Sequence, residues 1–92
     1  MPETTLLVPG CGTTRITYVS DNTFVINPVA SPAYQVVYYD GIYTVGLYSS
    51  LGVEPNIELR IGDSLLNYMS NEYVAMSLDA AIFHINKRMN GA

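Results

Sequence analysis

Residues 34–48, YQVVYYDGIYTVGLY, carry the clearest structural signal in the sequence. Two runs rich in aromatic and β-branched residues flank Asp40-Gly41, and both residue types favour strands. An Asp-Gly pair between such runs predicts a type I′ turn, because both central residues of that turn need positive φ. The turn sets the register of an antiparallel hairpin in which the facing pairs are apolar or aromatic. These pairs are Tyr38 with Tyr43, Val36 with Val45, and Tyr34 with Leu47.

The predicted hairpin has two unlike faces. The facing pairs form an apolar face, which we expect to pack in the core. The opposite face is mixed, and we expect it to be partly exposed. It consists of Gln35, Val37, Tyr39, Ile42, Thr44, Gly46 and Tyr48.

Further strands are predicted on both sides of this hairpin. Residues 15–19 and 23–26 alternate, and the turn residues 20–22 between them form a three-residue loop that places Tyr18 opposite Phe24 and Ile16 opposite Ile26. Residues 57–61 alternate as strictly, and residues 72–76 predict a short strand. Residues 64–70 fit either a short helical turn or a strand. We expect no strand in the lead-in 1–13 or in the loops 27–32 and 49–56.

The end of the chain predicts an amphipathic helix. Ser77 is a plausible N-cap, and Asp79 follows in the first turn, where a carboxylate favours the helix dipole. Lys87 and Arg88 stand in the last turn before Gly91. Phe83 falls away from the buried stripe, whose members are Leu78, Ala81, Ile82, Ile85 and Met89.

These elements predict an α+β fold, an antiparallel sheet of four or five strands packed against one C-terminal helix. At 92 residues the chain forms a single domain over residues 1–92. The helix stripe and the apolar hairpin face need each other, because neither is buried alone.

The charge balance argues against several functions. Four Lys and Arg stand against eight Asp and Glu, for a net charge of −4, so direct binding of duplex DNA is not expected. The acidic residues are too dispersed for strong imitation of DNA, but their excess favours a basic partner surface. No apolar run is long enough for a transmembrane helix. The opening Met1-Pro2-Glu3 lacks the basic start of a secretory signal, and the single Cys11 fits a reducing cytoplasm.

No set of residues predicts catalysis, a cofactor or a metal. Cys11 and His84 are the one thiol–imidazole combination available, and no feature of the sequence brings them together. Glu54, Glu58 and Asp63 are spaced four and five residues apart, unlike the alternate ligands of a metal loop. The expected function is therefore binding rather than chemistry.

Aromatic residues left over from the core indicate where a protein partner binds. Only 13% of the chain is charged, and exposed aromatics are typical interface anchors. We predict a first patch at Tyr39, Asp40, Thr44 and Tyr48, and a second on the helix at Phe83, His84 and Lys87. The acidic residues Glu54 and Glu58 are the next candidates. The alternative is a structural or self-associating subunit in which a second copy covers Tyr39 and Tyr48.

In size, acidic composition and sheet-plus-helix layout, the chain resembles the phage-encoded anti-CRISPR proteins, in particular inhibitors of type I surveillance complexes. That group shares no diagnostic motif, so the resemblance transfers no functional residue. It implies evasion of host defence by stoichiometric binding to a Cas effector complex in the bacterial cytoplasm. Such binding often covers the place where guide or target nucleic acid docks.

Overall fold

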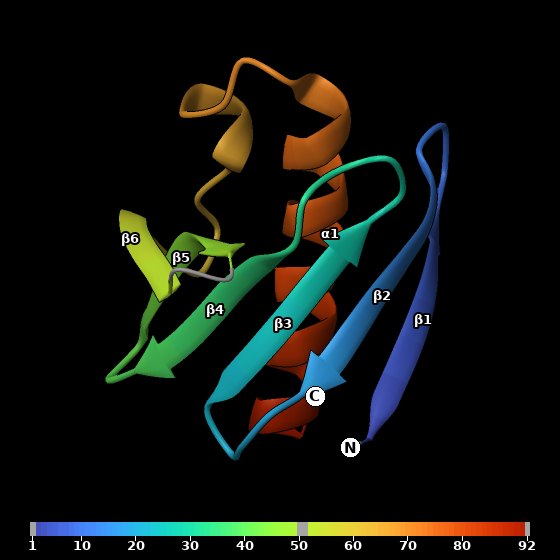
Figure 1. The fold of residues 1–92 in the computed structure, drawn as a ribbon. Coiled ribbons are helices and arrows are strands. Elements are labelled where there is room, and N and C mark those ends of the chain that lie inside the picture. Colours follow the sequence, from blue (N-terminus) through green and yellow to red (C-terminus); the bar gives the residue numbers. More distant parts are fainter. Residues whose placement is uncertain (1, 50–51, 92) are drawn as a thin grey trace.

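A computed structural model describes residues 2–49 and 52–91, without the side chains of residues 53–56. Within that range the chain forms one antiparallel sheet whose six strands follow each other in sequence order (Figure 1). A short 3-10 helix, η1, and a long helix, α1, follow the sheet. The bounds are β1 Glu3–Val8, β2 Gly12–Tyr18, β3 Thr23–Pro28, β4 Tyr34–Tyr39, β5 Ile42–Ser49, β6 Gly52–Arg60, η1 Leu65–Asn67 and α1 Glu72–Asn90.

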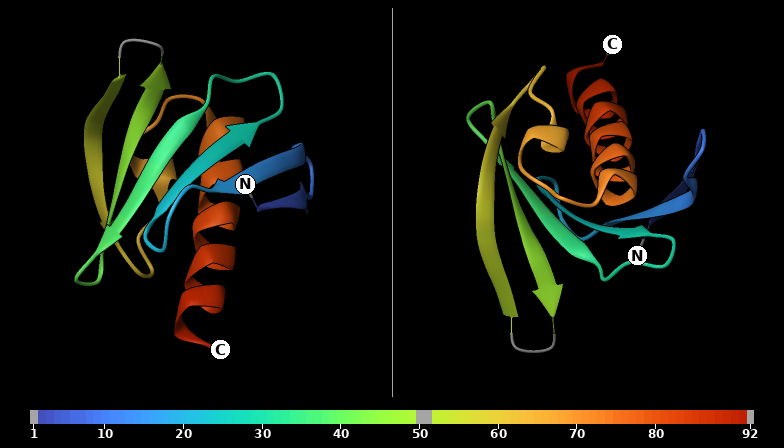
Figure 2. Two further views of the ribbon diagram at one scale, coloured as in Figure 1. Left: turned by 60° about the horizontal axis from the view of Figure 1, so that its bottom comes forward. Right: turned by 90° about the horizontal axis from the view of Figure 1, so that it is seen from above.

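The molecule has two layers. The sheet curls around α1, and η1 lies on the same side of the sheet as α1 (Figure 2). Helix α1 contacts β1, β2, β3 and η1. We call the sheet face toward α1 the inner face and the opposite one the outer face; no described element covers the outer face. The predicted α+β class is confirmed, but the sheet has six strands rather than four or five.

The central hairpin has the predicted register. Tyr38 pairs with Tyr43, and Val36 pairs with Val45. Asp40 and Gly41 have φ of 53° and 79°, as a type I′ turn requires. The predicted pairing of Ile16 with Ile26 and Tyr18 with Phe24 in the β2–β3 hairpin is also confirmed. Local turn chemistry and apolar patterning therefore agree in both hairpins.

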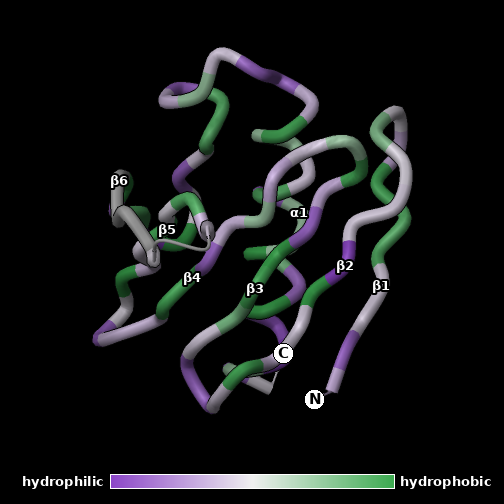
Figure 3. Tube along the Cα trace, viewed as in Figure 1, coloured by the Kyte–Doolittle hydropathy of each residue, from purple (hydrophilic) through white to green (hydrophobic). Residues whose placement is uncertain are grey.

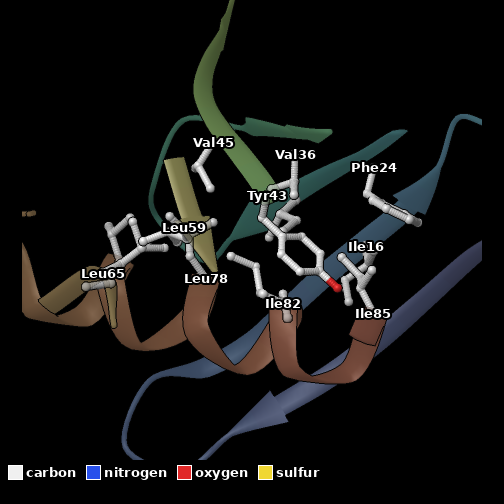
Figure 4. Packing of buried hydrophobic residues seen from close by; sticks show 14 of the residues in the cluster. Ile16, Phe24, Val36, Tyr43, Val45, Leu59, Leu65, Leu78, Ile82 and Ile85 are labelled. Carbon is white, nitrogen blue, oxygen red and sulfur yellow. The ribbon is translucent and has the colours of Figure 1, made fainter. Parts of the chain in front are cut away.

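The core lies between the inner face and α1. Tyr43 is fully buried and extends from β5 toward α1 among aliphatic side chains (Figure 4). Its hydroxyl donates a 3.4 Å hydrogen bond to Oδ1 of Asn86. Tyr18 and Phe24 meet edge to face, with ring centroids 5.7 Å apart. Strongly hydrophilic segments are few along the trace, in keeping with the low charged fraction (Figure 3).

The prediction of a lead-in without a strand is wrong. Residues 3–8 form β1, which pairs with β2 from Glu3↔Thr17 to Val8↔Gly12. Thr4, Leu6 and Val8 alternate toward α1 and are less exposed than their neighbours. A turn of three residues, 9–11, connects β1 to β2, and its Gly10 has a φ of 79°. The consecutive pairs Thr4-Thr5 and Leu6-Leu7 break strict apolar–polar alternation, so the alternation pattern did not predict this strand.

Three more boundaries differ from the predicted ones. Strand β3 continues through Asn27 and Pro28, which were predicted to begin the loop 27–32. Strand β6 begins at Gly52, so residues 52–56 belong to a strand, and residues 50 and 51 of the predicted loop lie outside the described residues. Residues 72–76 are the first turns of α1 rather than a strand. Val74, Ala75 and Leu78 are all buried and continue the helical stripe toward the N-terminus.

The helix also begins at a different cap. Asn71 is the N-cap, and its Oδ1 accepts a 3.2 Å hydrogen bond from the N–H of Val74. Ser77, the predicted cap, is fully buried inside the helix. The predicted end is confirmed, since Gly91 adopts φ 68° and donates its N–H to the carbonyl of Lys87.

Asp79 has a tertiary role instead of the predicted place in the first turn. One of its oxygens accepts a 2.8 Å hydrogen bond from the Ser64 hydroxyl, and the other accepts a 2.9 Å bond from the Leu65 N–H. Ser64 is itself the N-cap of η1. Asp79 therefore holds η1 against α1. Of the two alternatives predicted for residues 64–70, the short helical turn is the one that forms, at Leu65–Asn67.

Candidate functional site

The outer face of the sheet is a broad surface that no described element covers (Figure 2). Its centre carries no formal charge and is only half-buried by neighbouring side chains. Formal charges lie toward its two edges, with Glu3 and Arg15 on β1 and β2, and Glu58 and Arg60 on β6. The uncharged centre consists of Thr17, Thr23, Val25, Gln35, Val37, Ile42 and Thr44.

The first predicted patch lies on this outer face, and we call it the hairpin patch: Tyr39, Asp40, Thr44 and Tyr48. The side chain of Tyr39 is 77% exposed and that of Tyr48 is 46% exposed. Asp40 is exposed in the turn, and Thr44 is half-buried. Tyr39 pairs with Ile42, six residues before Tyr48, so about 20 Å of strand separates the two rings. The patch is an extended strip with an aromatic ring at each end.

The structure joins one of the predicted acidic residues to this strip. Glu58 is exposed and lies directly across from Thr44 in the β5–β6 register. Glu54 lies in β6 opposite Leu47, but its side chain is outside the described part of the chain. Because Glu58 and Asp40 flank the same strip, the outer face has carboxylates beside its exposed aromatics.

The second predicted patch, which we call the helix patch, lies on the other side of the sheet. Phe83 is 64% exposed, as its position off the buried stripe predicts. Lys87 places its Nζ 5.6 Å from the centroid of the Phe83 ring, and His84 is half-buried beside it. These residues border a shallow groove between α1 and β1. One flat interface cannot include both patches, because the sheet lies between them.

Two features of the surface were not predicted from the sequence. One is the groove at β1, since β1 itself was not recognised. The other is an open groove of about 570 Å³ between the β4–β5 strands and the segment after η1, whose walls include Tyr34, Leu47, Tyr68 and Met69. Leu47, predicted to be core, is 37% exposed there. The contact of residues 68–71 with β5 depends on the η1 turn, for which the sequence left two alternatives.

Cys11 and His84, the thiol and imidazole that the sequence offers, lie in different parts of the fold. Cys11 is buried in the β1–β2 turn, and no hydrogen bond joins it to His84 in the described part of the chain. Across residues 2–49 and 52–91, no three His, Cys, Asp or Glu side chains gather as metal ligands would. Tyr43 has a raised pKa, caused first by burial and second by the adjacent Tyr38. Tyr43 lies in the core, so its raised pKa results from its place in the fold.

Comparison of the chain with protein families, with curated proteins and with solved structures gave no match. None of the helices in the described residues has the length and apolar character that a membrane span requires.

Proposed function

We propose that this protein is a non-catalytic binding protein that occupies the surface of a protein partner with the outer face of its sheet. The observation that carries the proposal is the uncovered, uncharged centre of that face with Tyr39 and Tyr48 exposed at its ends. Threonine, valine and tyrosine lose less rotamer entropy on contact than lysine or glutamate do. Such a face is therefore suited to an interface with little ordering cost.

The proposed partner is a CRISPR-Cas effector complex in a bacterial cytoplasm, which the chain would inhibit by stoichiometric binding. Support comes from the resemblance to anti-CRISPR proteins and from the charge of the face. Asp40 and Glu58 border the aromatic strip, and the whole chain carries a net charge of −4. A basic patch, such as a protein uses to hold guide or target nucleic acid, complements this surface.

The test measures the affinity of the chain for a purified type I effector complex. Tyr39→Ala and Tyr48→Ala each remove an exposed aromatic anchor, and loss of such an anchor typically weakens binding by about 2 kcal/mol, or roughly thirtyfold. The melting temperature is expected to stay near that of the wild type. Tyr68→Ala is the matched control, because Tyr68 is 60% exposed but lies at the groove on the inner side.

Two results would contradict this proposal. A chain that does not bind the complex at micromolar concentration has a different partner or none. Folded Tyr39→Ala and Tyr48→Ala variants that bind as tightly as the wild type show that the interface lies on another surface.

A second candidate function is self-association through the same outer face. The half-buried apolar side chains Val25, Val37 and Ile42 at its centre favour this alternative, because a second copy stacked on the face would bury them. Sedimentation equilibrium separates the two functions. A stable homodimer that dissociates in Val37→Lys supports self-association, whereas a monomer that binds the effector complex supports inhibition.

A further inference from the structure

Strand β1 is an open edge of the sheet (Figure 1). Tyr18 donates its N–H to the carbonyl of Pro2 at 3.0 Å, which sets the phase of the β1–β2 ladder. Backbone groups alternate in direction along an antiparallel strand, so those of Thr4, Leu6 and Val8 point to β2. The backbone N–H and C=O groups of Glu3, Thr5 and Leu7 therefore point outward, away from β2. No strand of the described chain lies on that side.

The two edges of the sheet differ in how they resist pairing. Strand β6 contains Pro55 and the charged residues Glu54, Glu58 and Arg60, all of which hinder the addition of another strand. Strand β1 contains only Glu3 as a charged residue and has no proline. Leu7 is 81% exposed on it. Of the two edges, only β1 lacks protection.

Basic side chains gather beside this unprotected edge. His84, Lys87 and Arg88 of α1 border a shallow groove with Thr4 of β1. The groove continues along β1 past Leu6, Pro9 and Phe83. It thus holds the only histidine and two of the four Lys and Arg residues of an acidic chain. Arg88 is oriented by the Tyr18 ring, whose centroid is 4.0 Å from its guanidinium carbon.

We propose that the β1 edge binds an extended segment of a partner protein that carries acidic side chains on the side facing α1. The outward backbone groups of Thr5 and Leu7 would pair with the segment as with an added strand. Every second side chain of an added strand would point toward the helix, where carboxylates meet the cations of the groove. Backbone pairing supplies affinity, and the sign of charge supplies selectivity.

A second copy of this chain is the competing occupant, and its charge argues against it. Antiparallel pairing of two β1 strands about a twofold axis at Thr5 keeps both helices on the same side of the joined sheet. That arrangement turns the positive charge of Lys87 in one copy toward Lys87 of the other. Like charges across an interface oppose such pairing, whereas a carboxylate-bearing strand is attracted.

This inference stands apart from the proposed function, because the edge and its groove lie outside the hairpin patch. The probe is a short synthetic peptide of alternating glutamate and valine, with an alternating lysine and valine peptide as its matched control. Nuclear magnetic resonance titration measures both dissociation constants. We expect the acidic peptide to bind at least about tenfold more tightly, as a favourable charge-assisted contact implies. Hydrogen exchange at the amides of Thr5 and Leu7 is expected to slow when it binds.

Two pairs of variants assign the binding to this edge. Thr5→Pro removes an outward N–H that β2 does not use, so the fold is expected to persist while peptide binding is lost. Thr5→Val keeps that N–H and is its control. Lys87→Glu is expected to abolish or reverse the preference for the acidic peptide and tests the inference even if Thr5→Pro does not fold. Arg60→Glu makes the same charge change at the other edge and is expected to leave the preference intact.

Three results would overturn the inference. The first is equal binding of the acidic and basic peptides. The second is binding without slower exchange at Thr5 and Leu7. The third is a dimer in sedimentation equilibrium that Thr5→Pro converts to a monomer, because a second copy would then occupy the edge.

Discussion

The inner and outer faces of the sheet are made by the same six strands but have opposite character. Val36 and Val37 are neighbours in β4, yet Val36 is fully buried under α1 while Val37 is half-buried on the open side. The inner face contributes nearly all of the buried strand residues in the core cluster, among them Ile16, Ile26 and Tyr43. The buried side chains that stabilise the sheet therefore lie on its inner face, and substitutions on the outer face are expected to affect stability less.

The outer face is unusual because its centre mixes polar and apolar side chains and carries no formal charge. An antiparallel sheet with one solvated face generally alternates apolar and polar residues, and many solvated faces use charged side chains. Here threonine, glutamine and valine occupy the centre, and the charges lie toward the edges.

The largest expected effect comes from placing the same carboxylate on each face. Val36→Asp buries a charge without a partner and loses the transfer energy of a buried valine, about 1.5–3 kcal/mol, plus several kcal/mol for desolvation. That sum approaches the whole stability of a small domain, about 5–15 kcal/mol, so we expect unfolding. Circular dichroism with urea denaturation measures the free energy of unfolding.

Val37→Asp is the matched change on the outer face. Its side chain reaches solvent, so we expect a folded variant with a much smaller loss. On the helix side of the same core, Ile82→Asp is expected to unfold the protein as Val36→Asp does. A folded Val36→Asp variant, or equal losses at the two valines, would show that the faces do not differ in this way.

An intermediate effect is expected at the inner attachment of η1. Asp79→Ala removes the acceptor for the Ser64 hydroxyl and the Leu65 N–H and leaves both donors without it. Loss of such a partner costs about 1–3 kcal/mol, which denaturant unfolding can measure. Asp79→Asn, which retains one acceptor oxygen, is expected to lose less. If Asp79→Ala is as stable as the wild type, the bonds to η1 contribute nothing to folding.

The smallest expected effect is an alkaline loss of stability from the core. Burial, and then Tyr38, raise the pKa of Tyr43 above its ordinary value of 10.0. The unfolded state therefore ionises first. The contribution of Tyr43 is full below pH 10.0 and declines as the pH rises toward the folded pKa. Tyr43→Phe is expected to flatten the fall of unfolding free energy above that pH, and an unchanged slope would contradict this role.

Tyr39→Phe on the outer face is the matched control for that measurement, because its ring is 77% exposed. Tyr43→Phe also removes the hydrogen bond to Asn86, so its stability at neutral pH is measured first. The two variants are then compared by the slope of unfolding free energy against pH. A stability difference that is the same at every pH does not change that slope.

Local sequence determined the parts of this fold in which near neighbours constrain one another. Asp40-Gly41 needs positive φ, and the facing pairs around it need one register, so the central hairpin could be predicted to the residue. The three-residue loop after Tyr18 did the same for β2 and β3. The helix end at Gly91 and the exposure of Phe83 and Tyr39 also followed from spacing alone.

Tertiary contacts decided what spacing left open. Glu72–Met76 combines two strand-favouring residues with three helix-favouring ones, and it is helical because Val74 and Ala75 pack into the core and Asn71 caps the helix. Strand β1 exists because β2 offers it an edge and α1 covers its alternate side chains. The same pairing placed the helix patch beside an open strand edge and kept it apart from the hairpin patch. Such arrangements depend on residues far apart in the chain, whose proximity no local pattern encodes.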